Sequence, residues 1–123
     1  MGYRTLDTSA VEPSDDRPCT LRRLAEPAGL ERLALNRFRA EPGEMLPLAY
    51  HYHDEQEEAF YVLSGTLHVE TPEETHEIGE NGLFAVDPGS PQRAFNPETA
   101  TAAVEVLAIG APPVSGDVHA YEP

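Results

Sequence analysis

The chain has 123 residues, enough for one hydrophobic core and too few for two domains. Its net charge is −14, which argues against nucleic acids and anionic membranes as partners because those surfaces would repel it. All eight basic residues are arginine. The absence of lysine from so acidic a chain favours adaptation to a salt-rich cytoplasm, as in a halophile, over an ordinary acidic protein.

This charge predicts a rise in melting temperature between dilute buffer and molar KCl. At about 1 M salt the screening length shrinks to roughly 3 Å, so neighbouring surface carboxylates no longer repel one another. Thermal melts followed by circular dichroism at both salt concentrations test the prediction. A melting temperature that stays level or falls would contradict halophilic adaptation.

The N-terminal region, 1–25, is mostly polar and predicts an arm or one edge strand. It has no apolar core of a signal peptide, and no apolar run in the chain approaches about 18 residues, so we expect a cytoplasmic protein with no membrane anchor. Cys19 is the only cysteine, which excludes an intrachain disulfide. Pro27 and Gly29 interrupt the following segment, which favours strand, turn and strand. A helix over Pro27–Leu35 is the alternative.

From residue 33 onward, short apolar runs alternate with turn signals such as Pro42-Gly43, Ser64-Gly65 and Pro88-Gly89. Many short strands at this spacing are typical of a β-sandwich or β-barrel. We therefore expect a barrel over 26–113 and a C-terminal tail over 114–123. The predicted strands are LALNRFRA (33–40), LPLAYHYH (46–53), EAFYVL (58–63), TLHVET (66–71), THEI (75–78), LFAV (83–86), QRAFN (92–96) and AAVEVLAIG (102–110).

The run EAFYVL is apolar on both faces of its predicted strand. Alternation places Phe60 and Val62 on the inner face with Glu58, and leaves Ala59, Tyr61 and Leu63 outside. An apolar outer face needs a cover, either the N-terminal arm or a second subunit. We therefore predict a homodimer.

Potential metal ligands concentrate in HYHDEQEEAFYVLSG, residues 51–65. On an extended strand His51 and His53 point to the same face, roughly 6.5–7 Å apart. Glu58 begins the next strand, where antiparallel pairing could bring its carboxylate to the same ion. Two histidines and one carboxylate suit Fe(II), Mn(II), Ni(II) or Zn(II).

These residues resemble the first motif of the cupin family, in which a glycine, an HxH pair, a glutamate and a second glycine follow one another. His51, His53, Glu58 and Gly65 match it, with four residues between His53 and Glu58 and six between Glu58 and Gly65. Glu57 is the alternative acid, one residue too far from Gly65. The resemblance covers roughly residues 31–110 and implies a jelly-roll barrel, or double-stranded β-helix, with a metal in its mouth.

The second cupin motif is matched less closely, in GLFAVDPGSPQRAFN. Pro88, Gly89, Pro91 and Asn96 fit, but Gln92 occupies the position of the family's histidine. An amide oxygen is a poorer transition-metal ligand than an imidazole, so the fourth ligand is weak, replaced by water, or absent. With Gln92 facing the site, strand alternation adds Ala94 and Asn96 to the wall of the substrate pocket begun by Phe60 and Val62.

The resemblance implies a divalent metal bound by His51, His53 and Glu58, with Gln92 nearby, and a small oxygenated molecule as ligand. Similar cupins include dioxygenases, isomerases and lyases. The alternative is a non-catalytic cupin that binds a small ligand with a weakened or lost metal site. Two arginines leave a further choice open: Arg37 and Arg39 would bind an anionic substrate if they face inward, and would pair with surface carboxylates if Phe38 faces inward.

Overall fold

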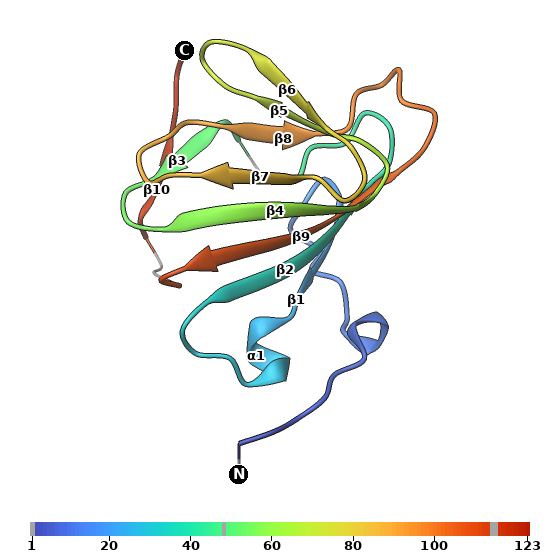
Figure 1. Cartoon of the computed structure of the whole chain (residues 1–123), viewed down its shortest axis with the longest axis vertical. Helices are drawn as coiled ribbons and strands as arrows, with labels where there is room; N and C mark the ends of the chain where they lie inside the picture. The colour runs from blue at the N-terminus through green and yellow to red at the C-terminus, as the bar shows by residue number, and fades with distance from the viewer. Residues whose placement is uncertain (1, 48, 114–115) are drawn as a thin grey trace.

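The protein folds as a small all-β barrel built from antiparallel strands, as predicted (Figure 1). The structure is a computed structural model and describes residues 2–47, 49–113 and 116–123. Among these residues no helix has the length and apolar character needed to span a membrane. In chain order the elements are η1 (Thr8–Ala10), β1 (Thr20–Arg23), α1 (Ala25–Ala28), β2 (Ala34–Ala40), β3 (His51–His53), β4 (Glu57–Ser64), β5 (Leu67–Glu70), β6 (Thr75–Ile78), β7 (Leu83–Val86), β8 (Arg93–Phe95), β9 (Val104–Ala111) and β10 (Val118–Ala120).

In the described ranges, three sheets enclose the core. One has five strands in the order β1-β2-β9-β4-β7, one has three in the order β6-β5-β8, and β10 pairs with β3. Figure 1 shows the β6-β5-β8 sheet facing the five-stranded sheet, with β3 and β10 at one end of the barrel. The buried side chains of the two larger sheets meet between them, among them Val62, Val69 and Val106, each fully buried. The strand expected over 46–53 is observed as β3 alone, and Leu48 within that run lies outside the described residues.

Strand alternation places the side chains of β2 and β4 as the sequence predicts. Phe60 and Val62 are buried, whereas Leu63 on the opposite face of β4 is exposed. On β2 Phe38 is buried, which decides between the two orientations of the arginines. Arg37 and Arg39 point outward and pair with Glu105 of β9 at 3.1 and 3.6 Å. These two arginines are therefore surface partners of acidic side chains.

The N-terminal region supplies an edge strand and a short helical turn. β1 pairs with β2, and α1 occupies the turn that Pro27 and Gly29 were expected to make. Gly29 ends α1 in the left-handed conformation, at φ 72°, so the alternative helix over Pro27–Leu35 is wrong. Before β1 the chain folds back on itself, because the Ser14 amide donates to the carbonyl of Leu21 at 2.7 Å.

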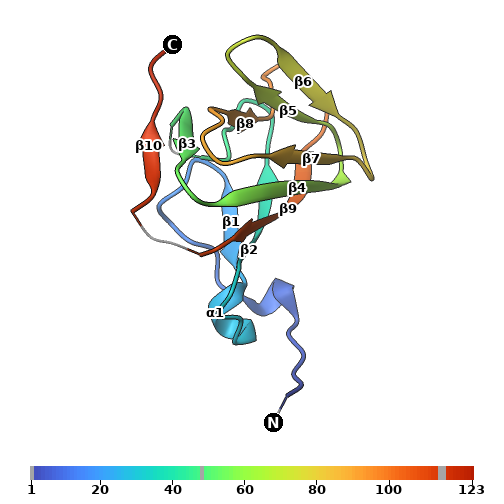
Figure 2. The ribbon, with the colours of Figure 1, turned by 60° about the vertical axis from the view of Figure 1, so that its left-hand side comes forward.

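Residues 118–120 form a strand of the barrel, whereas a tail was expected over 114–123. β10 pairs antiparallel with β3, so that Val118 lies opposite His53 and Ala120 opposite His51. Figure 2 shows β10 beside β3 with the chain end running past the barrel. The polar composition of this segment hid its role, since a three-residue edge strand needs backbone pairing and little apolar surface.

Gly65 closes the turn between β4 and β5. Its φ is +79°, and a Cβ at this position would lie 2.5 Å from the carbonyl oxygen of Ala103. Only glycine avoids both the left-handed strain and this clash. The close approach fixes where β4 ends and hence the register of the strand that begins with Glu58.

Candidate metal centre

The structure brings His51, His53 and Glu58 together at one end of the barrel. One potential ligand atom from each of the three lies within 4.8 Å of the other two. The two histidines come from the same face of β3, and the glutamate comes from the start of β4, as alternation predicts. Within the part of the chain that the structure describes, no other three such side chains form a comparable group.

The His51 ring is oriented by the backbone. Its Nδ1 lies 2.9 Å from the carbonyl oxygen of Ala49. A carbonyl oxygen can only accept, so Nδ1 carries the proton and Nε2 keeps its lone pair. Burial lowers the pKa of His51 and thus favours the neutral ring. A neutral imidazole with a free Nε2 is the form that binds a metal.

The His53 ring is held by Asp117, which lies just before β10. His53 Nδ1 lies 2.9 Å from Oδ1 of Asp117, whose Oδ2 accepts the amides of Glu55 and Gln56 at 3.1 and 3.0 Å. Burial opposes ionisation of Asp117, but these hydrogen bonds outweigh it and lower its pKa. An ionised Asp117 fixes the tautomer of His53 and leaves Nε2 free toward the site.

Glu58 faces that free nitrogen. Its Oε1 lies 3.3 Å from Nε2 of His53, which is within ion-pair distance. This oxygen is buried, and it forms no hydrogen bond with any described group. Burial, the largest influence, raises the pKa of Glu58. Two lone pairs facing each other across 3.3 Å are stable only with a proton or a cation between them. The donor set therefore fits a divalent transition metal.

Gln92 lies beside this group, in an isolated antiparallel β-bridge with His51. Its backbone exchanges two hydrogen bonds with His51, with N···O distances of 2.9 and 3.3 Å, so both side chains lie on the same side of the barrel mouth. Gln92 is 2 % exposed, and its Oε1 has no hydrogen-bond partner among the described residues. A buried amide oxygen without a partner costs free energy, which a ligand in the cavity would recover.

A cavity of about 220 Å³ opens in front of these side chains. Of the four residues expected on its wall, Phe60 and Ala94 line it and Val62 and Asn96 do not. Val62 lies deeper, fully buried in the core. Asn96 is also buried, and its amide donates to the carbonyls of Ala40 and Ala102 at 3.1 and 2.9 Å. The lining residues are Arg17, Ala34, Asn36, Phe38, Leu46, Pro47, His51, His53, Gln56, Glu58, Phe60, Gln92, Ala94 and Ala108.

Comparison with known proteins agrees with this architecture. Residues 36–110 match the cupin domain family. The chain belongs to the cupin family. A search of curated protein sequences gives no match.

Several solved structures share this fold, and they belong to differently named proteins. A sugar phosphate isomerase of the cupin superfamily from Silicibacter pomeroyi is 26 % identical, with a TM-score of 0.75 over 88 % of this chain and 75 % of that one. The polyketide cyclase RemF from Streptomyces resistomycificus is 22 % identical, with a TM-score of 0.80 over 98 % and 87 %. A Streptomyces PAC13 variant with uridine is 18 % identical, with a TM-score of 0.76 over 99 % and 93 %.

Four polar residues of this cupin's site were not anticipated from the sequence. Asn36 follows from the inward orientation of Phe38, because strand alternation puts both on the same face. Gln56 is buried on the cavity wall, with its amide donating to the Pro112 carbonyl at 3.2 Å. Arg17 and Asp117 lie outside residues 36–110, in segments whose composition carries no strand or motif signal. No pattern in the sequence points to either.

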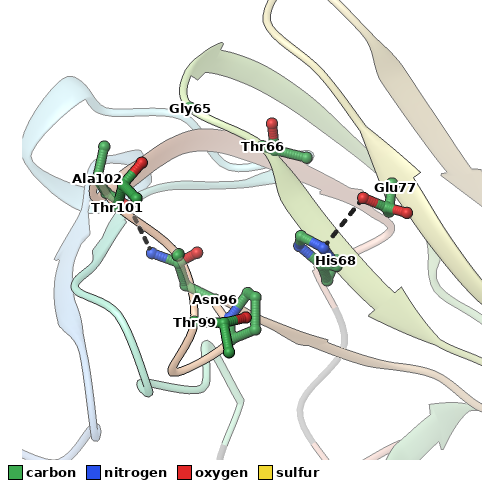
Figure 3. Close-up of a pocket in the computed structure, with 10 residues that line it drawn as sticks. Gly65, Thr66, His68, Glu77, Asn96, Thr99, Thr101 and Ala102 are labelled. Atoms are coloured by element: carbon green, nitrogen blue, oxygen red, sulfur yellow. Dashed lines mark hydrogen bonds and ion pairs between the residues drawn. The ribbon is translucent and has the colours of Figure 1, made fainter.

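A larger groove, of about 430 Å³, lies at the turn that follows β4 (Figure 3). His68 faces Glu77 across it at 3.3 Å, and Asn96 lines it. The groove is open and holds one histidine and one carboxylate, whereas the group of three potential metal ligands lines the smaller cavity. The remaining histidines have structural contacts: His76 packs on Phe84, and His119 stacks on Tyr52.

Proposed function

We propose that this cupin binds a divalent transition metal through His51, His53 and Glu58, with Gln92 as a weak fourth ligand or as a wall of the site. The observation that carries the proposal is the 3.3 Å approach of His53 Nε2 to Glu58 Oε1, while Nδ1 of the same ring is committed to Asp117. This geometry supports a metal site, because both imidazoles are held in the ligand tautomer by their outer hydrogen bonds.

A small oxygenated molecule would bind at the remaining coordination positions. A bound divalent metal supplies Lewis acidity toward ligand oxygens and, where it is redox-active, electrons for oxygen chemistry. The chain itself shapes the space: Phe60, Ala94 and Leu46 exclude water, and Gln92 and Asn36 offer amide groups that orient polar atoms. A cavity of about 220 Å³ admits only a small molecule. The 26 % identity to a sugar phosphate isomerase supports an isomerase-type reaction among those open to such a site.

Elemental analysis of protein purified without chelator tests the metal centre. We expect a content near one divalent ion per chain, and a higher melting temperature when the metal is restored after chelation, because a ligand that binds only the folded state stabilises it. A content at background, together with no shift on adding Fe(II), Mn(II), Ni(II) or Zn(II), would contradict the proposal.

The second candidate is a non-catalytic cupin that holds a small ligand without a tightly bound metal. The observation that favours it is Gln92, whose amide oxygen is a weaker ligand than the imidazole at this position in the family motif. The two candidates differ in whether the metal content survives dialysis against buffer without chelator.

A Gln92→His substitution measures how close residue 92 lies to the metal. Since the Gln92 side chain is buried beside His51, a histidine there would complete a set of three imidazoles and one carboxylate, and we expect tighter binding of Zn(II) or Ni(II), by roughly tenfold or more. Competition with a chromogenic chelator gives both affinities. Unchanged affinity in a folded variant would place residue 92 outside the coordination sphere.

We also propose that two copies of the chain pair through the outer face of β9, β4 and β7. The N-terminal residues before β1 cover part of the outer face beside β1 and β2. There the Thr8 hydroxyl accepts a hydrogen bond from Arg37 at 3.0 Å, and the Val11 carbonyl accepts one from Arg22 at 3.1 Å. The rest of the face is apolar at its centre, with the carboxylates of Glu57 and Glu105 at its margins. Its apolar residues are Ala59, Tyr61, Leu63, Leu83, Ala85, Leu107 and Ile109.

Light scattering coupled to gel filtration is expected to give twice the mass of one chain. Replacing Leu83 and Ile109, which are 62 % and 37 % exposed, with glutamate should yield monomers, because burying four added carboxylates at a twofold interface is unfavourable. Val118→Glu, at an exposed site on β10, is the matched control. A monomeric wild type would contradict the proposal.

A further inference from the structure

The segment before β1 forms part of the wall of the metal centre. The pairing of Ser14 with Leu21 folds it into a turn, and Figure 2 shows this stretch rising beside β3 and β10. Cys19 is buried, and its thiol lies 3.7 Å from the carbonyl oxygen of Leu46, a residue of the cavity wall. Burial raises the pKa of Cys19 to about 11, so it remains a thiol and acts as an anchor. The turn is thereby fixed over the barrel mouth.

Arg17 is the residue that this turn places at the entrance. It lines both the inner cavity and an adjoining outer pocket of about 340 Å³, which it shares with Pro47, His51 and His53. Its side chain is 24 % exposed, and its Nε is buried without a hydrogen-bond partner among the described residues. The guanidinium thus stands between solvent and the two histidines.

The charge of Arg17 is only weakly compensated. The one carboxylate oxygen within 4.0 Å of it in the described ranges is Oδ1 of Asp16, at that limit. Asp16 is itself bound by the Ser14 hydroxyl and lies 3.5 Å from Arg23. By contrast, Arg37 and Arg93 have close acidic partners, at 3.1 and 2.7 Å. At a cavity entrance, an arginine with so weak an acidic partner and a buried Nε without a hydrogen-bond partner among the described residues is available to an anionic ligand.

We propose that Arg17 binds the carboxylate or phosphate group of a small molecule whose other end reaches His51, His53 and Glu58. This rests on the function proposed above. A guanidinium pairs with planar or tetrahedral oxyanions through two parallel hydrogen bonds, which a lysine cannot do. A bound divalent ion would be balanced by Glu58 and the ionised Asp117, so Arg17 would give the site its net positive charge and favour an anionic ligand over a neutral one.

Three probes with the same three-carbon backbone test the inference by calorimetry on metal-loaded protein: glycerol, glycerate and glycerol 3-phosphate. We expect the charged probe of the preferred class to bind wild type roughly tenfold to a hundredfold more tightly than glycerol. Arg17→Gln should abolish this preference, and Arg17→Lys should keep only part of it. Arg32→Gln, at an exposed site between α1 and β2, is the matched control and should keep all of it.

The comparison of glycerate with glycerol 3-phosphate identifies which anion the site takes. The inference is overturned if neither charged probe binds wild type better than glycerol, or if Arg17→Gln retains the preference. Metal content measured on the same samples separates this failure from that of the metal centre. An Arg17→Gln variant with a full complement of metal and no anion preference supports the inference, whereas a wild type without metal contradicts the proposed function.

Discussion

A variant in which alanine replaces both His51 and His53 is expected to retain no divalent metal above background. The two rings supply two of the three side chains that converge within 4.8 Å, and a lone buried carboxylate is not a transition-metal site. The variant should fold, because both rings lie at the barrel mouth and neither belongs to the apolar core. It should also lose the stabilisation that metal gives the wild type, about 2.7 kcal/mol when free metal is a hundred times its dissociation constant.

The control for this variant is the double substitution His68→Ala, His76→Ala. These histidines lie on β5 and β6, pair with Glu77 and Glu74, and are half-buried like His51 and His53. Elemental analysis should find wild-type metal in the control and none in the test variant. Equal metal in the two double variants would mean that the ion binds elsewhere.

Asp117→Asn is expected to weaken metal binding by roughly tenfold to a hundredfold while leaving all proposed ligands in place. An asparagine has one oxygen and one NH₂ where aspartate has two oxygens. If the NH₂ faces His53, Nδ1 must become the acceptor and the proton moves to Nε2, where it blocks the metal. If the NH₂ faces the amides of Glu55 and Gln56, two donors oppose it instead. The second arrangement leaves buried donors unsatisfied, which costs about 1–3 kcal/mol of stability.

Asp54→Asn separates this effect from a general loss of acidic charge. Asp54 is a neighbour of Asp117, because its amide donates to the Asp117 carbonyl at 3.1 Å. The Asp54 carboxylate, however, pairs with His119 on the surface. We expect wild-type metal affinity and nearly wild-type stability in this control. Metal affinity that is equal in both asparagine variants would show that Asp117 does not position His53.

The fold and the ligand group were predictable because each follows from a short-range pattern. The turn signals separate the strands, alternation gives the inner face of β4, and the spacing of His51, His53, Glu58 and Gly65 places the cluster on β3 and β4. The turn after β4 is unambiguous because a left-handed residue that packs against backbone must be glycine.

The rest of the site depends on contacts between distant parts of the chain, which no local pattern records. Asp117 lies 64 residues from His53, and Arg17 lies 34 residues before His51. Asn96 illustrates the opposite error: alternation alone placed it in the pocket with Ala94, but its amide donates to the carbonyl of Ala40 at the end of β2 and to that of Ala102 in the loop before β9. Buried backbone carbonyls need hydrogen-bond donors, and this requirement, not strand alternation, determines where the Asn96 side chain lies.

The pairing of β10 with β3 has a practical consequence for anyone who handles this protein. Two segments far apart in the sequence meet at the entrance to the cavity, the turn that carries Arg17 and the strand that follows Asp117. Changes in either segment would therefore act on ligand orientation and access. The same arrangement offers a route to engineering, because replacing these two segments would change which molecules enter without altering the strands that hold His51, His53 and Glu58.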